Sequence, residues 1–280
     1  MKKNYKTLSS SLATFAALLA LASPLRAADA SVDLVYWTFN SAGSFPSGGP
    51  ATAYSVATGI TATGLTRIAA HSISSAIGIN NTGGIGYFQR SAAGELRVAS
   101  SSYTNGGTGA SAYNNFSLTT ALARDNYFYF TLTANAGYDL TLDSLTFKSR
   151  AAEVTENARG FHVFSSIDGY DAGNVLLSAY AQSDSEGEPL AGSTLTTEFQ
   201  TFTVSSIAGT TISAGDSVTF RFYVQTPGVS AYMYFEDLIV TGTVTQAQTP
   251  GVPEPSTLAL IAGSVVLFIS LRLRRRARHL

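Results

Sequence analysis

The feature that most constrains the fold is a strict two-residue alternation of side-chain type in residues 126–133. Phe128, Phe130 and Leu132 fall on one face of an extended chain, and tyrosine and threonine fall on the other. An α-helix cannot use this period, because its faces repeat every 3.6 residues. The segment therefore predicts a β-strand whose phenylalanine face is buried.

Similar short segments, separated by turn signals rich in Gly, Asn and Asp, follow along the chain. They predict strands at Asp33–Phe39, Ile85–Gln89, Glu95–Ala99, Leu140–Lys148, Gly160–Ser166, Val175–Ala181, Glu198–Val204, Val218–Val224 and Ala231–Val244. About ten to twelve short strands without intervening helices predict an all-β fold, an antiparallel sandwich over residues 31–245. The single tryptophan, Trp37, is expected in its core.

Residues 140–148 are expected to form a hairpin with residues 126–133 across the turn Asn135-Ala136-Gly137. Their alternation slips by one residue at Asp143-Ser144. A β-bulge produces such a slip, because it places one extra residue in one strand of a pair.

The first 30 residues are typical of a secretory signal peptide. Lys2, Lys3 and Lys6 precede an apolar segment at 12–22, and Ala28-Asp29-Ala30 fits the small-x-small cleavage rule, with cleavage after Ala27 as the alternative. Export would engage the Sec translocon and a signal peptidase. The chain has no cysteine, so the exported domain must be stabilised by its core alone.

The C-terminal 29 residues combine three features in order. Pro253-Glu254-Pro255 is a stiff tripeptide, Leu258–Leu271 contains no charge, and five arginines follow: Arg272, Arg274, Arg275, Arg276 and Arg278. Residues 256–272 predict a short transmembrane helix, and the arginines keep this end cytoplasmic. Residues 246–251 are expected to be a linker between domain and tail.

This tail closely resembles the PEP-CTERM sorting signal, carried by Pro253, Glu254, Pro255, the apolar span and the arginine cluster. The resemblance implies an exported protein of a Gram-negative bacterium that an exosortase processes after membrane anchoring, for placement at the cell surface or in the exopolysaccharide matrix. Two alternatives are an ordinary tail anchor and a GPI-type signal. GPI-type signals normally end in apolar residues, so the terminal arginines argue against that alternative.

The charge of the exported part excludes one class of partner. Residues 31–250 hold eight basic and 16 acidic residues, a net charge of −8. Nucleic acids and polyanionic polysaccharides are bound through basic patches, so neither is an expected partner.

The central region also resembles jelly-roll sandwiches akin to carbohydrate-binding modules, through residues 36–40, 164–170 and 235–242. The resemblance implies a structural calcium ion held by Asp237 together with Asn40, because Ca²⁺ prefers carboxylate and carbonyl oxygens. The alternative is that Glu236-Asp237 is a solvated acidic pair at the start of the last strand. Outward tyrosines are candidates for stacking on sugar rings, or otherwise part of the core: Tyr127, Tyr129, Tyr232 and Tyr234.

No catalytic site can be assigned. His71 and His162, the histidines of the central region, lie in no nucleophile elbow or zinc motif, and no Gly-rich phosphate loop is present. The sequence thus predicts a non-catalytic surface protein with no required cofactor. A displayed glycan-binding module is the second hypothesis, and a polysaccharide hydrolase is the third.

Overall fold

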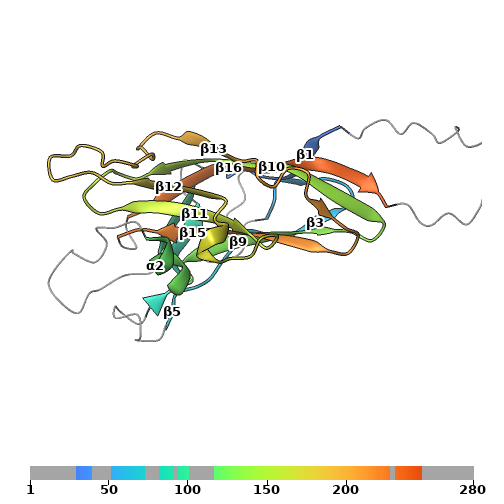
Figure 1. Ribbon diagram of the computed structural model, residues 1–280, viewed down its shortest axis with the longest axis horizontal. Helices are drawn as coiled ribbons and strands as arrows, with labels where there is room; N and C mark the ends of the chain where they lie inside the picture. Colours follow the sequence, from blue (N-terminus) through green and yellow to red (C-terminus); the bar gives the residue numbers. More distant parts are fainter. Residues whose placement is uncertain are drawn as a thin grey trace, which may run out of the picture. The chain divides into compact units, whose positions relative to one another are not determined.

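Two antiparallel β-sheets face each other across one core (Figure 1). The computed structural model describes residues 30–39, 52–72, 82–90, 94–100, 117–227 and 231–247. Within these residues the predicted all-β sandwich is confirmed. Inside each of the two large sheets every strand pairing is antiparallel, and residues of both sheets share one core.

The larger sheet, called sheet I, has β10, β16 and β1 at its centre. Its strands are β1 (Val32–Trp37), β2 (Ser55–Val56), β7 (Ile85–Arg90), β8 (Leu96–Ser100), β10 (Tyr138–Ala151), β13 (Gln200–Val204), β14 (Thr211–Ile212) and β16 (Met233–Gln246). The last strand, β16, pairs with β10 along one edge and with β1 and then β8 along the other. The end of the domain is therefore held in the middle of its sheet.

The second sheet, called sheet II, runs in the order β12-β11-β15-β9-β3, and β4 also pairs with β9. Its strands are β3 (Ile60–Ala62), β4 (Thr66–Arg67), β9 (Tyr127–Ala134), β11 (Arg159–Ser165), β12 (Leu177–Ala181) and β15 (Ser217–Gln225). A separate small pair joins β5 (His71–Ser72) to β6 (Thr82–Gly83).

The core lies between the sheets and is built by the predicted alternation. Phe128, Phe130 and Leu132 of β9 and the even-numbered residues of 218–224 in β15 are fully buried. Trp37 is 1% exposed, and its ring centroid lies 4.5 Å from that of Phe130. Burying a large aromatic side chain stabilises a fold by a few kcal/mol, about 1.5–3 for phenylalanine, so this cluster dominates folding.

The predicted hairpin between β9 and β10 is wrong. The two strands follow each other through residues 135–137 but belong to different sheets. Both edges of β9 are occupied, by β15 on one side and by β3 and β4 on the other, while β10 pairs with β16, β13 and β14. Alternation alone cannot distinguish a hairpin within one sheet from a connection between two facing sheets. In both cases the apolar side chains of the two strands point into the same core.

The predicted irregularity in β10 is confirmed, and one boundary is corrected. The register of β10 against β16 shifts between Leu142 and Ser144, where the sequence alternation slips. β16 continues to Gln246, which pairs with Tyr138. The first residue of the predicted linker is therefore part of the sheet.

One short helix contradicts the expectation of strands alone. In α2 (Leu118–Ala123), the Ser117 side chain caps the helix by accepting a hydrogen bond from the Thr120 N–H at 3.3 Å. Leu118, Ala121 and Leu122 share one face, as a 3.6-residue period requires, and pack on the outer face of sheet II. No helix within the described ranges is long and apolar enough to span a membrane.

Candidate binding surface

A row of side chains crosses four strands on the outer face of sheet I and ends at the residue before a fifth. Cross-strand register places Gln89 of β7 opposite Arg97 of β8, and Arg97 opposite Tyr234 of β16. Tyr234 faces Arg150 of β10, and Phe199 lies just before β13, next to Arg150. These residues point outward because their neighbours in each strand, such as Leu96 and Val98, are buried in the core. We call the set the Arg–Tyr row: Gln89, Arg97, Tyr234, Arg150 and Phe199.

Each guanidinium of the Arg–Tyr row lies against aromatic rings. The Arg150 Cζ atom is 3.9 Å from the Tyr234 ring centroid and 5.0 Å from that of Phe199. Arg97 Cζ lies 5.5 Å from the Tyr234 ring and 5.8 Å from the Tyr232 ring. Cation–π attraction and packing of the side-chain stems therefore hold the row together.

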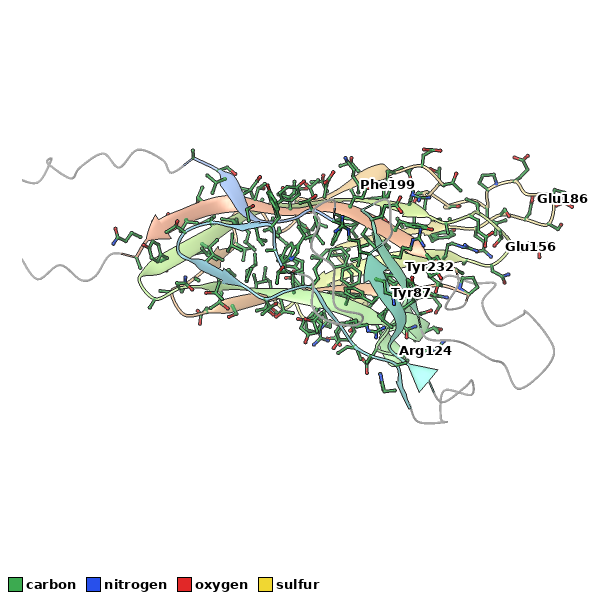
Figure 2. The ribbon with its side chains drawn as sticks, turned by 180° about the vertical axis from the view of Figure 1, so that it is seen from behind. Tyr87, Arg124, Glu156, Glu186, Phe199 and Tyr232 are labelled. Carbon is green, nitrogen blue, oxygen red and sulfur yellow. The ribbon has the colours of Figure 1, made fainter. Side chains whose placement is uncertain are left out.

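Beside the row, Tyr87 and Tyr232 form an aromatic pair (Figure 2). Their ring centroids are 4.7 Å apart and the rings are inclined at 49°. Tyr87 pairs across the strands with Ala99, which is fully buried. Both tyrosines remain partly exposed to solvent.

The two arginines differ in their charge balance. Arg150 Nη2 lies 2.8 Å from Glu95 Oε1, so a carboxylate offsets its charge. In the described part of the chain no carboxylate lies within ion-pair distance of Arg97, and its buried Nε has no hydrogen-bond acceptor there. Arg97 is the uncompensated cation of the row.

Acidic groups border the Arg–Tyr row on the next positions of the same strands. Burial, together with the nearby charges of Asp237 and Glu95, raises the pKa of Glu236. Lys148 lies directly opposite Glu236, and its Nζ is 2.7 Å from Asp237 Oδ2, which raises the pKa of Lys148. One lysine therefore faces two carboxylates, and an acidic surplus remains beside the row.

Asp237, a predicted calcium ligand, lies within β16 and not at its start. Its φ of +48° marks the left-handed backbone of the bulge opposite Phe147. Its carboxylate accepts hydrogen bonds from Lys148 Nζ at 2.7 Å and from Tyr36 Oη at 3.0 Å. A calcium ion would have to displace the ammonium. No group of three metal-ligating side chains occurs in the described residues, and Asn40 lies outside them. Calcium binding at Asp237 stays a prediction.

The four tyrosines proposed to stack on sugars do not share one surface. Tyr232 and Tyr234 border sheet I, whereas Tyr127 and Tyr129 belong to β9 of sheet II. Tyr127 and Tyr234 are each only 9% exposed, and an arginine covers a ring face of each: Arg221 at 4.5 Å and Arg150 at 3.9 Å. Of the four, Tyr232 and Tyr129 keep the more accessible rings.

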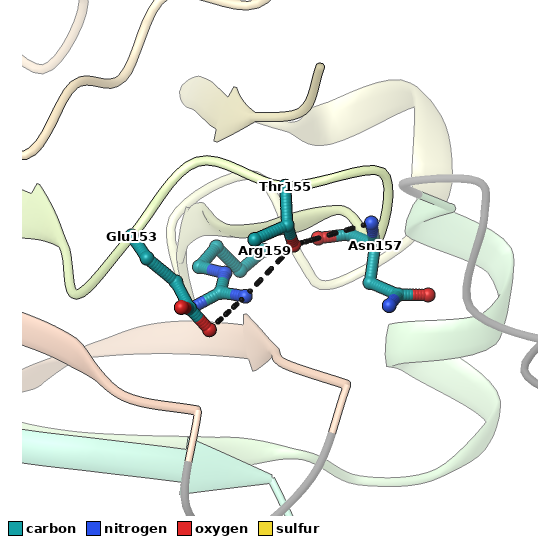
Figure 3. A network of polar contacts seen from close by, with 4 residues as sticks. All are labelled: Glu153, Thr155, Asn157 and Arg159. Atoms are coloured by element: carbon teal, nitrogen blue, oxygen red, sulfur yellow. Dashed lines mark hydrogen bonds and ion pairs between the residues drawn. The ribbon is translucent and has the colours of Figure 1, made fainter. Parts of the chain in front are cut away.

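A buried arginine lies at the same end of the sandwich as the Arg–Tyr row. Arg159 is 1% exposed, and its Nη2 donates hydrogen bonds to Glu153 at 3.0 Å and to Thr155 Oγ1 at 3.1 Å (Figure 3). Burial lowers the pKa of Arg159, and the Glu153 carboxylate opposes this effect. Arg159 lies on the core side of β11, so we assign this network to closure of the core.

The sequence missed most residues of the Arg–Tyr row and of the aromatic pair beside it. Arg97, Arg150, Tyr87 and Phe199 come from segments up to 112 residues apart, and only strand register brings them together. Alternation in residues 95–99 already places Arg97 on the outer face. No sequence signal identifies the residues of other strands that lie beside Arg97 on that face.

The predicted sorting residues lie outside the described residues, as do the signal peptide and the apolar span. They are Pro253, Glu254 and Pro255 and the arginines at 272, 274, 275, 276 and 278.

Comparison with known proteins adds little to the geometry. No family model matches the chain, and no curated protein does. Among solved structures, the K3 cleaved adhesin domain of Lys-gingipain from Porphyromonas gingivalis is similar over 76% of this chain and 99% of its own, with 18% identity and a TM-score of 0.32. A TM-score this low supports no conclusion about fold or function.

Proposed function

We propose that this chain is an exported, non-catalytic surface protein that an exosortase sorts and processes through its C-terminal tail. A signal peptidase removes residues 1–30 after Sec-dependent export. Residues 256–272 hold the precursor in the inner membrane, and the processed protein reaches the cell surface or the exopolysaccharide matrix.

The observation that carries this proposal is the order of features at the C-terminus. Pro253-Glu254-Pro255 precedes an uncharged run, and five arginines follow that run. The prolines keep the motif extended, and Glu254 offers a carboxylate to a cationic receptor group. The arginines oppose outward sliding of a span that is marginally short.

The geometry of the domain is compatible with this role. β1, which follows the predicted signal peptide, pairs with β16 through Val32 and Gly242, so both ends of the domain meet at one end of sheet I (Figure 1). A precursor could therefore be tethered at both ends without unfolding. Since β16 is paired along both edges, tension on the tail acts on a central strand.

For the finer fold we propose a jelly-roll-like sandwich. The chain crosses between the sheets at β9–β10, β10–β11, β12–β13, β14–β15 and β15–β16. Repeated crossing between two sheets is typical of jelly rolls.

A substitution in the motif tests the proposal in the native host. Glu254→Ala should leave export intact but block processing, so that full-length protein accumulates in the membrane fraction. Glu186→Ala, in an exposed loop, is the matched control and should be processed normally. Mass spectrometry of the mature protein reads the result.

Two further strains sharpen this test. In an exosortase deletion strain, the wild type should behave like Glu254→Ala. Neutral replacements of the five arginines should release unprocessed protein or scramble its topology. If the wild type keeps its whole tail in a host with active exosortase, a plain tail anchor replaces the proposal.

A second candidate function is glycan binding by the displayed domain. The specific observation is the partly exposed pair of Tyr87 and Tyr232 rings on the outer face of sheet I. Aromatic rings pack against the C–H faces of sugars. Both side chains of the pair are uncharged, so they suit the apolar face of a neutral sugar ring.

A further inference from the structure

We infer that the outer face of sheet I binds a glycan that carries isolated carboxylate groups, with Tyr87 and Tyr232 contacting a sugar ring and Arg97 pairing with the carboxylate. This inference rests on the second candidate function, glycan binding, and adds the charge class of the ligand and the residue that selects it.

The first step is the unequal charge balance of the two arginines. Arg150 has a carboxylate partner, Glu95, whose side chain is 8% exposed. Arg97 contacts Tyr232 and Tyr234 but, among the described residues, has neither a carboxylate partner nor an acceptor for its Nε. A guanidinium donates in a fixed fork that matches a carboxylate, so an anionic group is the complement that Arg97 lacks.

The second step is the position of Arg97 relative to the aromatic pair. Arg97 Cζ lies 5.8 Å from the Tyr232 ring, and Tyr232 lies 4.7 Å from Tyr87, measured between centroids. A sugar ring that rests on the tyrosines would bring a substituent within reach of Arg97. A uronate has its carboxylate as such a substituent, bonded directly to the ring.

The third step is the charge of the whole domain, which limits how dense the ligand's charge can be. Residues 31–250 carry a net charge of −8, and Glu236 and Glu95 lie next to the Arg–Tyr row. A polyanion with a charge on every sugar would be repelled. One carboxylate among neutral sugars fits a single unpaired cation better. An acidic protein segment offers the same carboxylate but no sugar ring for the tyrosine pair.

The position of this surface suits a displayed protein. Tyr234 lies twelve residues before Gln246 in the continuous strand β16, so about 40 Å separates the Arg–Tyr row from the point where the tail leaves the sheet. The proposed surface therefore lies at the end of the domain remote from the tail.

Calorimetry with two matched oligosaccharides tests the inference. The probes are xylotriose bearing one glucuronate and the methyl ester of the same compound, and the protein is the full-length chain in detergent. The wild type should bind the acid about tenfold more tightly than the ester, which corresponds to one charge-assisted contact. Arg97→Gln should bind both probes equally, at the affinity of the wild type for the ester. Tyr232→Ala should lose at least tenfold for both.

Arg221→Gln is the control, because it removes an arginine stacked on a tyrosine from sheet II and should change neither affinity. Equal binding of acid and ester by the wild type overturns the carboxylate inference but leaves glycan binding standing. Absence of binding to both probes overturns both. Arg97-dependent binding of a polyglutamate peptide without binding of either sugar would make the partner an acidic protein and also overturn the inference.

Discussion

The two outer faces of the sandwich each carry tyrosines stacked with arginine, but only one of them is covered. On sheet II, Arg221 lies 3.6 Å from the Tyr170 ring and 4.5 Å from the Tyr127 ring, and α2 packs over the neighbouring residues. Tyr223 and Phe164 complete a small second core there. On sheet I, Arg150 stacks on Tyr234 in the same manner, and in place of a helix the segment before β13 lies against it, through the Phe199 ring and through the Thr197 carbonyl, which accepts a hydrogen bond from Arg150 Nη1.

The difference shows that one pair of residue types serves two purposes. Under α2 the arginine and tyrosines fill a buried layer, and burial raises the pKa of Tyr127 and of Tyr223. On sheet I, by contrast, Tyr87 and Tyr232 beside the stack remain partly exposed to solvent. Stability measurements should therefore separate the faces even though their contact distances are alike.

The largest expected effect is on the covered face. Tyr223 is 2% exposed and contacts Phe164 and Tyr127, so Tyr223→Ala should lower the free energy of unfolding by about 3–5 kcal/mol, as large-to-small core changes do. Tyr232→Ala on the open face should cost about 1 kcal/mol or less. Urea denaturation of the full-length chain in detergent measures both. Equal losses would show that the two faces do not differ in burial energy.

The sequence predicted those features of the two sheets that depend on neighbouring residues, but not those that depend on residues far apart in the chain. The inward phenylalanines of β9 and β15 and the bulge near Asp143 follow from local alternation, and the structure confirms them. The partner of β9 does not, because pairing with β15 joins segments about 90 residues apart. The covering helix was missed because six residues give a helical pattern little weight beside the surrounding strands.

The candidate surface shows the same limit. Tyr232 and Tyr234 were predicted to face outward, yet the arginine that covers Tyr234 comes from β10 and could not be placed without the register. Tyr127 looks equivalent by alternation, although α2 and Arg221 bury it. Alternation identifies which residues leave the core. It does not show which of them a second layer will cover.

The pH dependence of the free energy of unfolding should also reveal burial on the outer side of sheet II. His162 lies on the outer side of β11, is 3% exposed, and has its pKa lowered to about 4 by burial. The unfolded chain binds a proton near pH 6.5 and the folded chain does not, so stability falls as the pH drops from about 6.5 to about 4. The loss attributable to His162 should approach about 3 kcal/mol at pH 4, at 1.36 kcal/mol per pKa unit.

Subtracting a variant isolates this contribution from the carboxylates that titrate in the same range. His162→Gln keeps a polar group beside Ser178, whose Oγ lies 2.7 Å from His162 Nδ1. The difference in unfolding free energy between wild type and variant should therefore change between pH 6.5 and pH 4 and stay constant above pH 7. A difference that stays constant across the whole range would show that His162 has the same pKa in the folded and the unfolded chain.

The salt response of the two stacked arginines compares the faces most directly. Arg221→Gln removes a cation from between Tyr127 and Tyr170 under partial cover, where a desolvated cation–π contact contributes up to about 2 kcal/mol. Arg150→Gln removes the equivalent contact on the open face, where about 0.5–1 kcal/mol is expected. The Arg150–Glu95 ion pair adds to this cost, because the two side chains are only 23% and 8% exposed and the substitution leaves the Glu95 carboxylate without this cation; salt should weaken this electrostatic part. Unfolding in 0.05 M and 0.5 M NaCl should thus reduce the cost of Arg150→Gln and leave that of Arg221→Gln, which has no carboxylate partner in the described residues, nearly unchanged. The same salt response for both variants would show that the covering layer does not exclude solvent from Arg221, and the distinction between the two faces would fail.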